Sequence, residues 1–320
     1  MILDTLTSPI ILFFVLGLIA GFARSDLAVP EALAKGMALY LMASIGLKGG
    51  VSVSDSGFTA DLGVAAAGGI LLSFLLPFPA FAALRRFGGL GRIDAGAVAA
   101  HYGSVSLVTF VTAQEMLTDA GLPAAGFMVA VLALMETPAI ITGLMLARRG
   151  AEASERSASG QLLHEVFLNA SVVMLVGAFV IGLIAGSDGF APVKPVFDGG
   201  YRGILCLFLL DMGLIAARRI VQSKALTPRL AALAVAIPLF NGLCGTLLGA
   251  ALGLDVGTTA MLGILAASAS YIAVPAAMRM ALPEANPGIY LSMSLGITFP
   301  FNVVIGIPLF AALAPMLVTS

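Results

Sequence analysis

The chain has little of what a soluble protein is built from: no tryptophan, two cysteines, two histidines and few charged residues. Charged residues make up 10% of its 320 residues, whereas a typical soluble domain has about 25%. Hydrophobic residues make up 60%, which is too much apolar surface to bury in one soluble core. We therefore expect lipid to be the solvent, and tyrosine and phenylalanine to form any aromatic belts at the membrane interfaces.

The scarcity of reactive side chains narrows the function. Cys206 and Cys244 lie in apolar runs without any metal-ligand spacing, so we predict that they are packing residues. The sequence shows no Ser/His/Asp set, metal cluster or nucleotide-binding motif, and we predict that the chain is not an enzyme and uses no cofactor. Its net charge of −1 argues against nucleic acid as a partner.

What the chain does contain is a series of apolar runs. Since a spanning helix needs roughly 20 apolar residues, we predict an all-α integral membrane protein with about ten spans. The first run has no basic segment before it and is read as a span, not as a cleavable signal. The predicted spans are residues 9–23, 30–49, 61–84, 94–117 (broken), 123–147, 164–186, 196–217, 229–253, 257–281 (broken) and 288–317.

The two halves of the chain are predicted to be repeats, residues 1–150 and 164–320, joined by a short linker, residues 151–163. The sequence Gly-Leu-Ile-Ala-Gly at 17–21 recurs at 182–186, and Gly46-Leu47 recurs as Gly213-Leu214, a shift of 165 to 167 residues. Five spans per repeat turn the second copy upside down, as in the inverted repeats of secondary transporters.

Positive charges divide between the two sides of this topology. The loops after odd-numbered spans hold 13 lysines and arginines, and the other side holds only Lys48, Lys194 and Arg202. The positive-inside rule then predicts that the linker is cytoplasmic and that both termini lie outside the cytoplasm.

Two breaks of small and hydroxyl-bearing residues interrupt the apolar sequence, His101–Thr109 and Ala267–Pro275, and a shift of 167 residues aligns them. Matched interruptions in two halves are the best sequence signal for a transporter's substrate site. The alternative is close helix packing, the usual role of serine, alanine and glycine in membrane helices.

In the first break, we expect Gly103 to end one half-helix through its conformational freedom, Ser104 to cap the next, and Ser106 to lie in its first turn. Ser268 and Ser270 precede the half-helix after the second break. Inversion would bring both half-helix N-termini to the bilayer midplane, where their N–H groups bind anions. Neither break contains lysine or arginine, which favours a small monovalent anion.

Polar residues embedded in the membrane are expensive and usually functional. Glu136 and Asn302 lie at nearly equivalent places of the fifth and tenth spans, each near a proline, and their oxygens suit Na+. The alternative is a structural polar pair between two kinked helices. Asp211 and Asn241 are further embedded candidates, and His101 is either a proton relay or a hydrogen-bonded structural group. Glu115 is expected at the membrane interface.

Four segments resemble the sodium-dependent bicarbonate transporter family first known from cyanobacteria: His101–Thr109, Ala267–Pro275, Met278–Pro287 and Ser294–Asn302. The Leu-Pro-Glu-Ala-Asn-Pro run at 282–287 is specific, because it is not a general membrane pattern. The similarity covers nearly the whole chain.

The resemblance implies a Na+/HCO3- symporter of the bacterial plasma (inner) membrane. It implies crossed broken helices (spans four and nine), a gate domain (spans 1, 2, 6 and 7), a core domain (spans 3–5 and 8–10), an elevator-like movement and a homotrimer. By motif match it implies bicarbonate contacts at Gly103, Ser104, Val105, Ser106, Ser268, Ser270 and Tyr271. It places cation or substrate contacts at Ser294, Thr298 and Asn302, which with Glu136 and Asn241 make up the predicted sodium site.

One departure concerns regulation. A PII-like protein inhibits cyanobacterial members, which carry a longer central loop than Arg148–Gln161 here, so a PII-like partner is left open. Two other functions stay open as well. A carrier of another small anion would have the same pattern. A Na+/H+ antiporter needs a titratable carboxylate at the crossing point, and the two breaks offer hydroxyls and His101 instead, which disfavours it.

Overall fold

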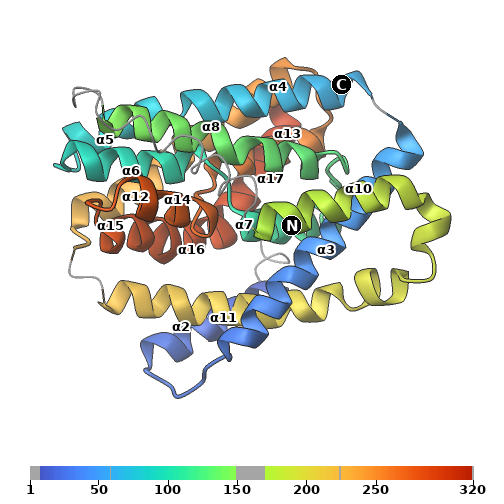
Figure 1. Cartoon of the computed structure of the whole chain (residues 1–320), viewed down its shortest axis with the longest axis horizontal. Coiled ribbons are helices and arrows are strands. Elements are labelled where there is room, and N and C mark those ends of the chain that lie inside the picture. Colours follow the sequence, from blue (N-terminus) through green and yellow to red (C-terminus); the bar gives the residue numbers. More distant parts are fainter. Residues whose placement is uncertain (1–7, 58, 149–169, 223–224, 319–320) are drawn as a thin grey trace.

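A computed structural model describes residues 8–57, 59–148, 170–222 and 225–318. These residues form helices and no strand (Figure 1). The helices, labelled as in Figure 1, are α2 Pro9–Phe22, α3 Glu31–Ser56, α4 Ala60–Leu75, α5 Pro77–Arg86, α6 Arg92–Gly103, α7 Leu107–Asp119, α8 Met128–Arg148, α10 Ala170–Phe190, η2 Pro195–Gly199, α11 Tyr201–Gln222, α12 Pro228–Ala251, α13 Val256–Ala267, α14 Ala273–Ala281, α15 Pro287–Leu291, η3 Ser292–Thr298, α16 Phe299–Phe301, η4 Asn302–Gly306 and α17 Ile307–Leu317.

Within the described residues, seven helical stretches are long and apolar enough to cross a membrane. Two shorter apolar helices, α2 and α13, coincide with further predicted spans. The predicted span 196–217 corresponds to α11, which carries charged residues and is not among the seven. The predicted linker, residues 151–163, lies outside the described residues, as does the start of the predicted span 164–186.

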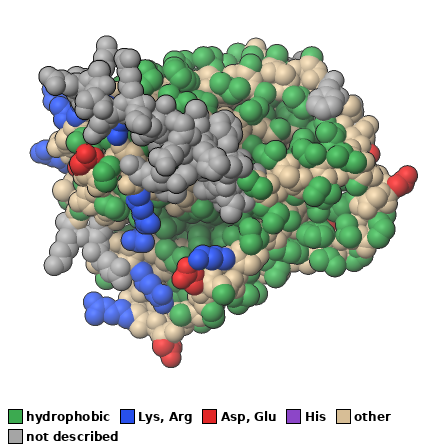
Figure 2. Space-filling view, viewed as in Figure 1, with side chains coloured by type: hydrophobic (Ala, Val, Ile, Leu, Met, Phe, Trp, Pro, Cys, Tyr) green, Lys and Arg blue, Asp and Glu red, His purple; other side chains and the backbone are tan. Residues whose placement is uncertain are grey.

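The surface of the molecule suits a lipid environment. Hydrophobic side chains are widespread over the right-hand part of the face seen in Figure 2, and lysine and arginine gather on its left. Large apolar side chains are widely exposed, among them Ile184 at 80% and Leu12 at 51%. Such extensive apolar exposure would be unfavourable in water and is expected in a bilayer. The protein is therefore a multi-pass membrane protein.

Two pairs of helices make a separate group at the lower and right side of Figure 1: α2 packs along α11, and α3 packs along α10. Glycines allow the close approach. A Cβ atom at Gly17 would lie 2.1 Å from the Leu210 carbonyl oxygen, and one at Gly182 would lie 2.3 Å from the Leu47 carbonyl oxygen. Only glycine fits at such distances.

The two predicted breaks are present as interruptions of helices. Three residues, Ser104–Ser106, separate α6 from α7, and five residues, Ser268–Ile272, separate α13 from α14. The N-cap residue predicted for the half-helix after the first break is wrong by two residues. Ser106, not Ser104, is the N-cap of α7, and its Oγ accepts a hydrogen bond from the Thr109 amide at 3.2 Å.

Gly103 serves packing instead of an unusual backbone conformation. It is the last residue of α6 and is absent from the residues with positive φ among those described. A Cβ atom there would lie 2.4 Å from Pro77 Cγ and 3.0 Å from Ala139 Cβ. The expectation that Gly103 ends the half-helix through its conformational freedom is therefore wrong, because the constraint comes from neighbouring helices.

The last span contains wide turns that the sequence did not indicate. Two π-helical segments, η3 and η4, flank the single turn of α16. π-Helical turns are rare and often occur at functional sites. They include the predicted sodium ligands Ser294, Thr298 and Asn302.

Candidate functional site

Two hydrogen bonds join the two breaks directly. The Ser106 amide donates to Ser268 Oγ at 2.9 Å, and the Ser270 amide donates to the His101 carbonyl oxygen at 2.9 Å. All four residues are buried. The broken helices α6–α7 and α13–α14 therefore meet at their interruptions, although 167 residues separate His101 from Ser268 in the sequence.

A small pocket lies at this meeting point. It is narrow and partly open to solvent. Its lining combines the first break, the second break and one residue of α8: Val105, Ser106, Leu107, Glu136, Ser270, Tyr271, Ile272 and Ala273.

Four of the seven residues predicted to contact bicarbonate line this pocket, namely Val105, Ser106, Ser270 and Tyr271. The other three, Gly103, Ser104 and Ser268, do not. Ser104 Oγ donates to the Glu136 carbonyl oxygen at 3.3 Å, and Ser268 Oγ donates to the Leu265 carbonyl oxygen at 2.7 Å. These serines hold the breaks in shape, a role that the sequence could not separate from substrate contact.

The starts of two half-helices face the pocket. Leu107 is the first residue of α7 and Ala273 the first of α14, and both line it. The first amides of a helix have no partner within the helix and form its positive dipole end. Ser106 Oγ and Ser270 Oγ accept hydrogen bonds from the amides of Thr109 and Val274, which leaves each hydroxyl hydrogen available to an acceptor in the pocket. The pocket therefore offers hydrogen-bond donors to an anion.

Two buried asparagines support the breaks from other helices. Asn241 Nδ2 of α12 donates to the Tyr102 carbonyl oxygen at 2.9 Å, and Asn302 Nδ2 donates to the Ala267 carbonyl oxygen at 2.8 Å. The Oδ1 atom of each amide has no hydrogen-bond partner among the described residues. A buried amide oxygen without a donor is a suitable ligand for a hard cation such as Na+.

Thr298 connects the last span to the first broken helix. Its hydroxyl donates to the Ala234 carbonyl oxygen at 2.6 Å and lies 2.6 Å from the Tyr102 hydroxyl, which is then the donor of that pair. Ser294 Oγ donates to the Tyr290 carbonyl oxygen at 2.7 Å. Within the described part of the chain, no group of three or more His, Cys, Asp or Glu comes together.

Glu136 is the one predicted sodium ligand that lines the pocket. It lies two residues before Pro138, where α8 lacks an amide N–H. Next to this proline, Ser73 Oγ of α4 bridges two backbone groups of α8. It donates to the Met135 carbonyl oxygen at 2.5 Å and accepts from the Ala139 amide at 3.1 Å. The breaks themselves contribute no carboxylate to the lining, and α8 adds one from outside them.

His101 and Asp211 lie outside this lining. His101 is fully buried, its Nδ1 donates to the Ala97 carbonyl oxygen at 2.7 Å, and its ring stacks on Tyr290 with 4.6 Å between centroids. Its Nε2 atom is buried without a hydrogen-bond partner among the described residues, so only one ring nitrogen is held as a structural group would be. Asp211 is buried in α11 at 5% exposure.

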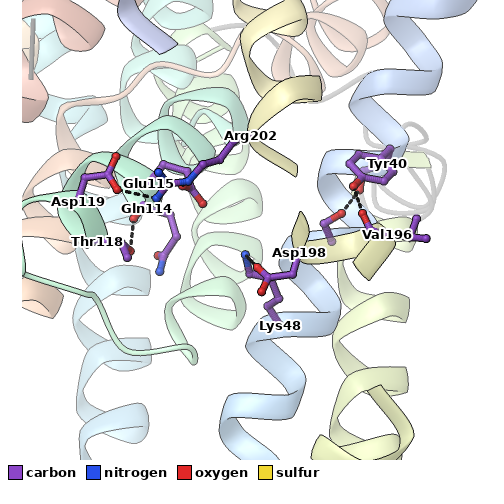
Figure 3. A network of polar contacts seen from close by, with 10 residues as sticks. Tyr40, Lys48, Gln114, Glu115, Thr118, Asp119, Val196, Asp198 and Arg202 are labelled. Carbon is purple, nitrogen blue, oxygen red and sulfur yellow. Dashed lines mark hydrogen bonds and ion pairs between the residues drawn. The ribbon is translucent and has the colours of Figure 1, made fainter. Parts of the chain in front are cut away.

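A second polar cluster links α7 to the group formed by α2, α3, α10 and α11 (Figure 3). Arg202 at the start of α11 makes ion pairs with Glu115 at 2.7 Å and with Asp119 at 2.5 Å, both on α7. Glu115 is 6% exposed, so its carboxylate is buried under the partly exposed Arg202. Nearby, Lys48 of α3 makes an ion pair with Asp198 at 2.7 Å.

Comparison with known protein families gives a match over most of the chain. A family model described as the Na+-dependent bicarbonate transporter superfamily covers residues 9–315. The chain belongs to this superfamily. Comparison with curated protein sequences gives no match. The family membership identifies the chain as a transporter and bicarbonate and Na+ as its substrates. For a bicarbonate transporter, a pocket at the start of two half-helices has the donors that a small anion requires.

Proposed function

We propose that the protein is a Na+-coupled bicarbonate symporter that imports HCO3- at the crossing of its two broken helices. The observation that carries this proposal is the pocket between Leu107 and Ala273, where two half-helices begin and two serine hydroxyls converge. HCO3- is small, singly charged and rich in acceptor oxygens. The donors of the pocket match it without a lysine or arginine that would retain it too tightly.

Na+ is proposed to bind beside this pocket, at oxygens of Glu136, Asn241, Ser294, Thr298 and Asn302. The unpartnered Oδ1 atoms of Asn241 and Asn302 support this assignment, because each amide is already fixed through its Nδ2 atom to a carbonyl group of a break. A cation so placed would neutralise the anion. The coupled pair then crosses the membrane at lower cost than either ion alone.

The movement is proposed to be elevator-like, with a core sliding against a gate made of α2, α3, α10 and α11. Repeat-equivalent glycines support an inverted-repeat architecture. Gly17 packs against Leu210 and Leu214, and Gly182 packs against Leu47; Leu214 and Leu47 are equivalent under the shift of 167 residues. In this scheme the ion pairs of Arg202 connect gate to core and must break when the core moves.

The assembly and orientation are also proposals. A homotrimer in the bacterial inner membrane rests on family likeness. The cytoplasmic position of the central linker and the external position of both termini rest on the uneven distribution of lysine and arginine. Regulation by a PII-like partner remains open because the central loop is short.

Uptake of radiolabelled inorganic carbon into proteoliposomes tests the proposed function. The assay runs at high pH with carbonic anhydrase inhibited, with or without an inward Na+ gradient, and with sulfate or acetate as competitor. We expect uptake that requires Na+ and is unaffected by the competitors. Uptake that is indifferent to Na+, or that the competitors block, would contradict the proposal and favour a carrier of another anion.

One observation favours a second candidate, a Na+/H+ antiporter. Such a protein needs a titratable carboxylate at the crossing point, and Glu136 lines the pocket there. Vesicle acidification or alkalinisation driven by a Na+ gradient in the absence of bicarbonate would support this candidate. Proton movement that depends on bicarbonate would support the symporter.

A further inference from the structure

We propose that the Glu136 carboxylate accepts the hydrogen of bound bicarbonate and thereby selects HCO3- over anions that carry no hydrogen. This inference rests on the proposed function, which supplies the bicarbonate, and adds a residue that decides specificity. Bicarbonate is an anion with one O–H donor as well as acceptor oxygens. A site that binds only its acceptor oxygens would not distinguish it from nitrate, which has the same planar shape and charge.

The placement of Glu136 carries the inference. The residue is 9% exposed, lines the pocket, and comes from α8 instead of from either break. Its Oε2 atom is fully buried and has no hydrogen-bond partner among the described residues. Buried polar atoms in proteins nearly always have partners, so an unpartnered carboxylate oxygen on a residue that lines a pocket calls for a donor that arrives from outside.

The other polar groups of the lining donate hydrogen bonds, whereas the Glu136 carboxylate accepts them. The hydroxyls of Ser106 and Ser270 can each donate a hydrogen, and the helix starts at Leu107 and Ala273 present amides. These groups are donors toward an anion. Glu136 is the charged acceptor among the lining residues. A ligand that satisfies all of them must therefore accept several hydrogen bonds and donate one.

The negative charge of the carboxylate makes this site selective for an anion that carries a hydrogen. An ionised carboxylate and an anion repel each other strongly in a buried site, and a shared hydrogen changes this repulsion into a charge-assisted hydrogen bond. Bicarbonate provides that hydrogen, whereas nitrate and carbonate do not. Sites built to hydrogen-bond a ligand's hydroxyl can reject analogues that lack it by about 10⁴-fold or more, because the polar group of the site is left unpaired.

The test compares wild type with Glu136→Gln in proteoliposomes, with radiolabelled bicarbonate as substrate and nitrate as competitor. In wild type, we expect a 100-fold excess of nitrate to leave Na+-driven uptake unchanged. Glutamine removes the negative charge and adds an amide donor. We therefore expect Glu136→Gln to raise the bicarbonate KM about tenfold and to lower the inhibition constant of nitrate at least tenfold.

The control is Glu284→Gln, the same chemical change at an exposed carboxylate, for which we expect wild-type behaviour. If Glu136→Gln does not transport, thermal unfolding of the purified proteins in detergent measures which anions each one binds. Bicarbonate but not nitrate should raise the Tm of wild type, whereas both anions should raise the Tm of the variant. A variant that keeps wild-type anion selectivity, with only its Na+ dependence shifted, would overturn the inference and leave sodium binding as the sole proposed role of Glu136. Wild type without Na+-driven uptake would instead contradict the proposed function.

Discussion

The two breaks meet at one pocket but are built differently. The first is three residues long, and its half-helix α7 is capped by the side chain of Ser106. The second is five residues long, and its half-helix α14 begins after Ile272, which makes no side-chain cap and is 40% exposed. The first break therefore has the stronger support at the start of its half-helix, because the corresponding bond in the second break, from the Val274 amide to Ser270 Oγ, is longer, at 3.4 Å.

The two breaks present the starts of α7 and α14 to one pocket although they are supported differently. Both inter-break hydrogen bonds fix the second break to the first, through Ser268 and Ser270. Local support of a segment raises the free energy of opening it, and segments without such support are the ones that move in functional cycles. We infer that the first break is the fixed half of the site. Substitutions should therefore act more strongly on the first break than on the second.

The largest expected effect comes from Gly103→Ala in the first break. The added methyl group would overlap Pro77 and Ala139, so we expect a loss of about 3 kcal/mol in the free energy of unfolding. Gly63→Ala is the matched control, because nothing lies within 4 Å of a Cβ atom there. The measurement is the thermal unfolding of both purified variants. Equal shifts in Tm would show that the first break is not tightly packed.

Ser268→Ala tests the connection between the breaks. The substitution leaves the buried Ser106 amide without its acceptor, which we expect to cost about 2 kcal/mol. Apart from the Ser106 amide itself, hydrogen exchange should then increase more among the amides of the second break than among those of the first. Unchanged exchange at both breaks would mean that the inter-break hydrogen bond does not hold the second one in place.

Arg202→Ala tests how the half-helix after the first break is attached to α11. Two ion pairs are lost, one of them with the buried Glu115. The arginine is 56% exposed, so we expect a cost of about 1–2 kcal/mol, less than the roughly 3–5 kcal/mol of a fully buried pair. If these pairs hold one state of the transport cycle, the maximal uptake rate should change about tenfold while Tm falls only slightly. An unchanged rate would separate the cluster from the movement.

The smallest expected effects distinguish the serines. Ser106→Ala removes a cap and a pocket hydroxyl, so we expect about 1 kcal/mol of destabilisation and a severalfold higher KM for bicarbonate. Ser270→Ala should raise KM with less destabilisation, because its bond to the Val274 amide is longer, at 3.4 Å. Ser104→Ala should change KM least, since this residue does not line the pocket. Uptake kinetics of the three variants give the order.

The sequence could predict what depends on composition and local pattern. Apolar runs indicated the spans, and clusters of small residues indicated both breaks at 101–109 and 267–275, where the structure interrupts its helices. The family resemblance was confirmed over residues 9–315.

What the sequence could not predict depends on how distant helices pack. Serines in a break are alike in sequence, yet Ser106 faces the pocket and Ser104 faces a backbone carbonyl. Glu136 was predicted as an embedded polar residue, but not as a pocket residue beside the breaks. No local signal joins Asn241 to the carbonyl of Tyr102, because 139 residues separate them and only tertiary structure brings them together.

The central claim is that Na+ and bicarbonate cross together. Its most direct test is uptake of radiolabelled Na+ into proteoliposomes driven by an inward bicarbonate gradient, with pH equal on both sides and no Na+ gradient. The account predicts that Na+ accumulates above its external concentration and that accumulation stops when nitrate replaces bicarbonate. Na+ uptake that ignores the bicarbonate gradient and follows an imposed pH gradient would contradict the account and identify a Na+/H+ antiporter.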